Sequence, residues 1–285
     1  MDSLKEKLKH IEQLDANVEV LAKITDLFSH DEVSTEEIEA ILATDVGLTT
    51  SLLRVANSAA SGGAVEIHTL RDAITRTGMR DIRRMVVTHS GASAAGNDLE
   101  GYGLSKHDAW RAAVAGAVAA EGMARRRGYS DPGLAFIAGL LRDCGKLAMQ
   151  QIIGGEELRQ AICKKSPTDD EAVWERGHFG FDHCEAGSEL AKLWGLPEEL
   201  ATAIRDHHHP NKDDPNELVD LIHCADAACL MLGIGVGLDG MAYEVDQEAC
   251  RRIDFDLTEM ERIGDDLRAG LEELVNMVGE GGNND

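Results

Sequence analysis

The sequence predicts an all-α fold, and its composition supplies the first reasons. The 285 residues include only five prolines, and the helix-favouring residues Ala, Leu and Glu are frequent. No segment shows the alternation of β-branched or aromatic residues with polar ones that is typical of a strand. Because 43% of the residues are hydrophobic and only 4% are aromatic, the core must be filled mainly by Leu, Ile, Val, Ala and Met.

Apolar spacing and capping residues define the expected helices of the first third of the chain. Residues 3–14 and 18–27 repeat Leu, Ile or Val every three or four positions, as on the buried face of a helix. Ser34 and Glu37 form a capping box before a third helix. The residues expected to begin or end the following helices are Asp45, Asn57, Thr69 and Gly78.

The rest of the chain predicts longer helices. Ser105 begins one that runs to about Arg127, and small residues such as Gly116 give it a face that a neighbouring helix can approach closely. Later start signals are Asp131-Pro132, Asp182-x-x-Glu185 and Thr258-x-x-Glu261, and Pro210 ends a helix. Further helices are expected over about 156–164, 168–176 and 217–232.

A change in composition divides the chain into two helical parts. Residues 91–104 are rich in Gly, Ser, Ala and Asn and predict a loop. We therefore expect a smaller N-terminal helical subdomain over residues 1–96 and a larger one over 97–278. The Gly- and Asn-rich tail, 279–285, is expected to be disordered.

The charge and the cysteines exclude several classes of protein. A formal net charge of −24 argues against general binding of nucleic acids, whose phosphates it repels. Two arginine clusters, at 80–84 and 125–127, are interpreted as solvated helix faces or helix ends. The start does not resemble a signal peptide, the six cysteines show no C-x-x-C spacing, and no apolar run approaches roughly 20 residues. We therefore expect an acidic, cytoplasmic protein with reduced thiols and no membrane span.

The stretch 138–147 is the centre of the candidate site. An apolar helix leads there into Arg142-Asp143, and a second apolar run follows Lys146. Further along the chain lie His183, the run His207-His208-His209, and Asp226. Carboxylates and imidazoles on otherwise apolar helices are typical of a metal site inside a helical bundle.

Five segments carry motifs that are specific in combination, namely residues 45–58, 67–78, 139–147, 180–197 and 203–208. With these motifs the chain resembles the HDOD (HD-related output domain) family over nearly its whole length. The resemblance implies a multi-helix HD-like domain, related to HD-type metal phosphohydrolases and preceded by the smaller N-terminal subdomain. It also implies a role in bacterial signalling or regulation, and many members are thought to lack catalytic activity.

The resemblance also implies that the usual HD metal site is degenerate here. An HD-type hydrolase holds its metal with a histidine, a His-Asp pair and a distant aspartate, and the metal activates water against a phosphate ester. These positions fall at Ala112, Arg142-Asp143 and Asp226. Alanine offers no ligand atom and a guanidinium offers no lone pair, so two of the four ligands are missing.

A residual metal site is the alternative. Two-metal relatives use further histidines, and His183, His207 and His208 match their positions. With Asp143 they would hold a single divalent Zn, Fe, Mn or Ni ion. Our primary expectation is that no cofactor is bound and that these residues form a buried, hydrogen-bonded and ion-paired network.

Arg142 indicates how that network would be held together. We expect its guanidinium to substitute for the metal by bridging Asp143 and Asp226 in a bidentate manner, with two of its nitrogens. Lys146 is expected to pair with a nearby carboxylate. His209 lies about 200° around a helix from His207 and is expected to be exposed or to cap the C-terminus of the helix.

The leading functional hypothesis is a non-catalytic regulatory module with no catalytic residue. It would bind a signalling protein or a nucleotide-like ligand, and formation of a homo-oligomer remains open. The rival is an enzyme, a metal-dependent phosphohydrolase that uses the residual His/Asp site. A third hypothesis is a scaffold that binds nothing small.

Overall fold

The computed structural model describes residues 4–8, 35–43, 46–57, 67–82, 84–86, 98–238 and 244–278. In these residues the regular structure is helical, and the only β-type pairing is an isolated bridge between Leu99 and Leu104. The predicted all-α class is therefore confirmed. None of the helices described is long and apolar enough to cross a bilayer. The predictions for 18–27, Ser34, Asp45 and the tail 279–285 lie outside these residues, and the boundary near residue 96 stays a prediction.

The N-terminal helices have a hydrophobic core of their own. This core belongs to α3 (Thr35–Leu42), α4 (Val46–Ala56) and α5 (Leu70–Thr77), whereas Leu8 of α1 (Leu4–Leu8) is buried in the core of the larger part of the chain. Leucines of α3 and α4 are buried against Ile74 of α5 and Ile82. The side chain of Asn57 closes this unit by accepting the backbone N–H of Ile67 at 2.7 Å and donating to its carbonyl at 2.8 Å. The predicted cap Thr69 accepts the Asp72 N–H at the start of α5.

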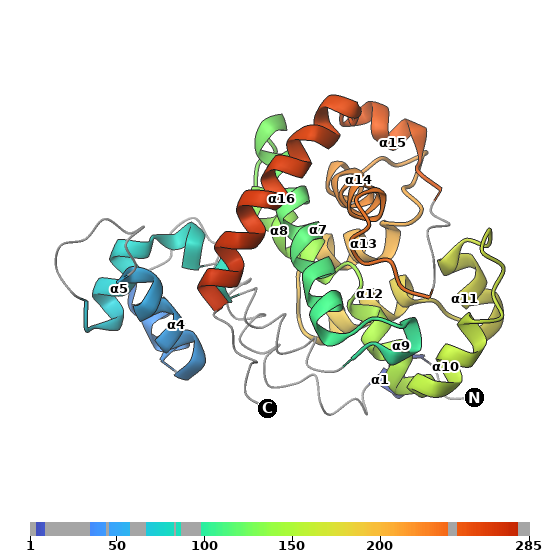
Figure 1. The fold of residues 1–285 in the computed structure, drawn as a ribbon, viewed down its shortest axis with the longest axis horizontal. Coiled ribbons are helices and arrows are strands. Elements are labelled where there is room, and N and C mark those ends of the chain that lie inside the picture. Colours follow the sequence, from blue (N-terminus) through green and yellow to red (C-terminus); the bar gives the residue numbers. More distant parts are fainter. Residues whose placement is uncertain are drawn as a thin grey trace.

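The described residues of the larger part, 98–238 and 244–278, begin with a short 3-10 turn, η3, and continue through ten helices. In chain order they are η3 (Glu100–Tyr102), α7 (Lys106–Arg127), α8 (Pro132–Leu141), α9 (Cys144–Ile153), α10 (Gly155–Ile162), α11 (Glu171–Phe179), α12 (His183–Leu193), α13 (Glu198–Asp206), α14 (Glu217–Met231), α15 (Gln247–Arg252) and α16 (Leu257–Val278). The long helix α16 lies between α7 and the N-terminal helix α4 and contacts both (Figure 1).

Helices α7 and α8 form the centre of this part and pack against each other with little space between their backbones. A Cβ atom built on Gly139 of α8 would lie 2.6 Å from the carbonyl oxygen of Gly116 in α7. The small-residue face of α7 therefore does permit the close approach that the sequence predicts. The predicted caps Ser105, Asp131 and Asp182 each accept a backbone N–H at the start of their helices.

Three local predictions need correction. The last helix begins at Leu257, and Asp256 accepts the Glu259 N–H at 2.9 Å, so the predicted cap at Thr258 is wrong. An anionic side chain is the stronger partner for the positive end of the helix. Helix α15 was not predicted, because six residues are too few to show periodicity. Part of the predicted loop 91–104 folds into η3, whose Tyr102 is buried.

The contact between α7 and α8 yields a prediction on stability. Gly139→Ala should lower the free energy of unfolding by about 1–3 kcal/mol, because the added methyl group meets backbone atoms that cannot move aside. Gly177→Ala is the matched control, since it is also helical but has no atom within 4 Å of the new Cβ. It should raise the free energy of unfolding by up to about 1 kcal/mol in urea titrations. Equal effects of the two substitutions would contradict the close approach.

Candidate functional site

Arg142 lies at the corner between α8 and α9, where it joins two carboxylates. Its side chain is only 2% exposed, and Nε donates to Asp226 Oδ1 at 2.6 Å. The same Nε lies 3.3 Å from Oδ2 of Asp143, the residue that precedes α9. The expected bridge between the two carboxylates is thus present, but it uses one nitrogen of the guanidinium rather than two.

The terminal nitrogens of Arg142 bind backbone carbonyls. Nη1 donates to Gly139 O at 2.8 Å and to Ala112 O at 3.2 Å, and Nη2 donates to Ala112 O at 3.3 Å. A Cβ atom on Gly116 would lie 2.0 Å from Nη1, so α7 has room for the guanidinium only because glycine stands there. Burial lowers the pKa of Arg142, but Asp226 and Asp143 outweigh this and raise it, so the group stays charged.

The first expected ligand position is covered by the chain that follows α14. A Cβ atom on Gly235 would lie 2.8 Å from the Cβ of Ala112, which places the two residues in direct contact. The cavity beside them measures about 50 Å³ and is lined by Arg142, Asp143 and Lys146, among others. That space accommodates a few water molecules.

Lys146 brings a second cation to Asp143. Its Nζ lies 3.4 Å from Asp143 Oδ1 and 3.4 Å from Glu171 Oε1, so the expected pairing with a carboxylate is present. Burial raises the pKa of Asp143, but Lys146 and Arg142 outweigh it and hold that pKa well below its usual value. Asp143 is therefore ionised and held between two protein cations.

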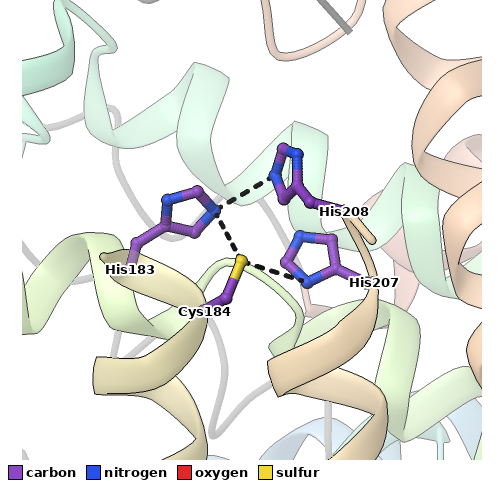
Figure 2. A group of neighbouring side chains, drawn as sticks. All are labelled: His183, Cys184, His207 and His208. Atoms are coloured by element: carbon purple, nitrogen blue, oxygen red, sulfur yellow. Dashed lines mark hydrogen bonds between the residues drawn. The ribbon is translucent and has the colours of Figure 1, made fainter. Parts of the chain in front are cut away.

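Three imidazoles and a thiol converge beside this carboxylate (Figure 2). His183 and Cys184 begin α12, while His207 and His208 follow the end of α13. His183 Nε2 lies 3.2 Å from His208 Nε2 and 3.4 Å from Cys184 Sγ, which lies 3.7 Å from His207 Nδ1. All four side chains are buried.

Glu175 orients His183, and the sequence analysis missed it. Glu175 Oε2 accepts the Nδ1–H of His183 at 2.7 Å and its backbone N–H at 2.9 Å, while Oε1 accepts the Tyr102 hydroxyl at 2.7 Å. A lone glutamate on a short helix carries no pattern that singles it out. Cys184, next to His183, was missed because one cysteine without a partner in sequence indicates nothing.

The charges of the imidazoles differ. Burial lowers the pKa of His183, but Cys184 and Glu175 outweigh burial and raise it well above the usual value. His183 is therefore an imidazolium that donates to Glu175 and His208. Burial lowers the pKa of His207 to about 4 and holds that of His208 well below its usual value, so both are neutral.

The structure brings the residual metal-site candidates together, with Asp143 Oδ1 3.7 Å from His183 Nε2. One donor atom from each of His183, Cys184, His207 and His208 lies within 4.8 Å of the others. Nitrogen and sulfur donors in this number suit a borderline ion such as Zn²⁺. His209 is outside the cluster, with its half-exposed ring 3.4 Å from Asp170.

Comparison with known proteins identifies the type of domain. A family model described as HDOD domain matches residues 14–210. An uncharacterized protein of Treponema pallidum (strain Nichols) is 25% identical over 210 residues, which cover 73% of this chain and 39% of that protein. The chain therefore spans less than half the length of this relative.

Three solved structures share the fold. A candidate signal transduction protein of Marinobacter aquaeolei VT8 aligns with a TM-score of 0.72 and 21% identity, over 98% of this chain and 62% of that one. An HDOD domain protein of unknown function from Geobacter sulfurreducens aligns with a TM-score of 0.65 and 23% identity, over 92% of this chain and 90% of that one. A candidate phosphohydrolase of Shewanella amazonensis SB2B aligns with a TM-score of 0.60 and 22% identity, over 93% of this chain and 97% of that one. At these identities the similarity extends to the fold alone.

The buried Arg142 yields a second prediction. Arg142→Met should lower the free energy of unfolding by about 3–5 kcal/mol, because it leaves the buried Asp226 without its cation. Arg205→Met removes an exposed pair with Asp206 and should change stability by less than about 1 kcal/mol. Urea titrations of both variants check this, and a stable Arg142→Met protein would show that the guanidinium is dispensable.

The neutral His207 yields a third prediction, on pH. Its pKa is about 4 in the folded protein and about 6.5 in the unfolded chain, so below pH 6.5 the unfolded chain binds the proton more readily. The free energy of unfolding should therefore fall by about 3 kcal/mol, because of this group, as the pH falls from 6.5 to 4. His207→Gln has no imidazole at this position and should not show this decrease. The difference in the free energy of unfolding between wild type and variant should therefore change by about 3 kcal/mol between pH 6.5 and pH 4. A difference that does not change with pH would refute the prediction.

Proposed function

The chain belongs to the HDOD domain family, and we propose that it is a non-catalytic regulatory module that acts by binding a signalling protein. Arg142 carries the proposal. It places a permanent charge against Asp143 and Asp226, the two carboxylates that remain of the metal set implied by the family resemblance. A cation bound there would have to displace a guanidinium that also donates three hydrogen bonds to the backbone carbonyls of Gly139 and Ala112.

The size of the central cavity favours a protein partner over a nucleotide-like ligand. A cavity of about 50 Å³ is far smaller than the several hundred Å³ typical of sites for small organic ligands. Gly235 and Ala112 lie in contact at the edge of this cavity. A protein partner needs no such cavity, because it can bind on the surface.

A metal-dependent phosphohydrolase is the second candidate, and one observation favours it. His183, Cys184, His207 and His208 offer four donors close to Asp143. A divalent metal bound there would supply an activated water for phosphoester hydrolysis. Against this, the imidazolium of His183 has no lone pair to give until it loses a proton.

Hydrolysis assays separate the two candidates. The tag-free chain would be incubated with Mn²⁺, Zn²⁺, Fe²⁺ or Ni²⁺, freed of excess metal, analysed for metal content and assayed with bis(p-nitrophenyl) phosphate. We expect no metal-dependent turnover, and therefore the same background rate for wild type, Asp143→Asn and His183→Gln. His178→Gln changes a histidine outside the cluster and is the control for loss of imidazole.

Each outcome of these assays discriminates. Turnover that requires a metal and disappears in Asp143→Asn and His183→Gln, but not in His178→Gln, would overturn the non-catalytic proposal. Bound metal without turnover would agree with it, because the metal would then have a structural role. Absence of both would agree with it as well.

A further inference from the structure

Two cysteines outside the candidate site lie in contact. Cys224 on α14 and Cys250 on α15 have their Sγ atoms 3.9 Å apart, within the range of a hydrogen bond between thiols. Both are reduced, and they come from different helices, 26 positions apart in the chain. The contact therefore depends on how α15 is held against α14.

An ion pair holds the two helices together next to these thiols. Arg252 of α15 donates to both oxygens of Asp220 of α14, at 2.6 and 2.7 Å. Asp220 lies one turn before Cys224, and Arg252 lies two positions after Cys250. Since the Asp220 side chain is buried, this pair fixes the position of α15 and keeps the thiols within reach of each other.

The two thiols differ in the way that a disulfide-forming pair requires. Cys224 is fully buried, whereas Cys250 is at the edge of the surface, with 9% of its area exposed. The hydrogen bond with Cys224 lowers the pKa of Cys250. Cys250 is thus the thiol that ionises and meets a reagent first, and Cys224 is placed to react next. Burial raises the pKa of Cys144, Cys184 and Cys229 to about 12, which makes them poor nucleophiles.

We propose that Cys224 and Cys250 are an oxidative modification site, at which a hydroperoxide converts the two thiols into a reversible disulfide. The Cys250 thiolate attacks the terminal peroxide oxygen, so that an S–O bond forms, the O–O bond breaks and the alcohol or water leaves with a proton. Cys224 then attacks the sulfur of the resulting sulfenic acid, the S–S bond forms and water leaves. Two thiols and one hydroperoxide give one disulfide, one alcohol or water, and one water.

Hydrogen bonds connect the site of the proposed disulfide with the imidazole cluster. A disulfide needs about 2.05 Å between sulfurs, so the two sulfurs must move together by almost 2 Å from their present 3.9 Å. His223, next to Cys224, accepts the N–H of Asp246, the cap of α15, at 2.8 Å and donates to the carbonyl of His207 at 2.7 Å. A movement of α15 would therefore alter the hydrogen bond that His223 donates to the carbonyl of His207.

Peptide mapping of the full chain tests the proposal. The reduced protein would be treated with hydrogen peroxide, its remaining thiols blocked with N-ethylmaleimide, and its peptides analysed by mass spectrometry without reduction. We expect a linked pair of peptides that contain Cys224 and Cys250, a loss of two of the six free thiols, and recovery of both with dithiothreitol. Absence of this linked pair after peroxide treatment would overturn the proposal.

Single substitutions test the order of events. Cys224→Ser should leave a sulfenic acid on Cys250 that dimedone traps, and Cys250→Ser should abolish the reaction at both positions. Cys163→Ser removes an exposed thiol elsewhere and should leave the linked pair unchanged. Trapping of dimedone on Cys224 in the Cys250→Ser variant would contradict the assignment of Cys250 as the attacking thiol. None of these results depends on whether the imidazole cluster is catalytic.

Discussion

The ion pair of Arg142 with Asp226 and Asp143 is the constraint on which the larger helical part depends. A guanidinium that is almost completely removed from water is stable only if each of its N–H groups and its charge find partners. Those partners come from three helices and a helix corner: Ala112 from α7, Gly139 from α8, Asp226 from α14, and Asp143 from the corner before α9. The position of each helix is thereby tied to one side chain.

The packing of α7 against α8 follows from the same constraint. Gly116 leaves room for the guanidinium, and Gly139 lets the α8 backbone approach α7 until carbonyls from both helices reach Arg142. A larger residue at either position would separate the helices or displace the arginine. The helix–helix contact and the polar centre are therefore one structural unit, and a change in one alters the other.

The sequence predicts local features well and long-range partners poorly. Thr69, Ser105, Asp131 and Asp182 were identified as caps because a cap acts on a backbone N–H two or three residues away. The ion pair between Arg142 and Asp226 was expected only through the family resemblance. Glu175 was missed, because its partner His183 is brought to it by a turn between helices rather than by helical spacing.

The charges at the site oppose the entry of a metal ion. Asp143 already faces Lys146, Arg142 and the imidazolium of His183, so protein cations supply the positive charge that a metal would bring. A metal at the imidazole cluster must first remove the Nε2 proton of His183, which Glu175 stabilises from the other side of the ring. A metal beside Asp226 must displace Arg142 from its ion pair with that carboxylate. Both steps act against interactions that also stabilise the fold, so the binding of a metal at either place is coupled to the stability of the domain.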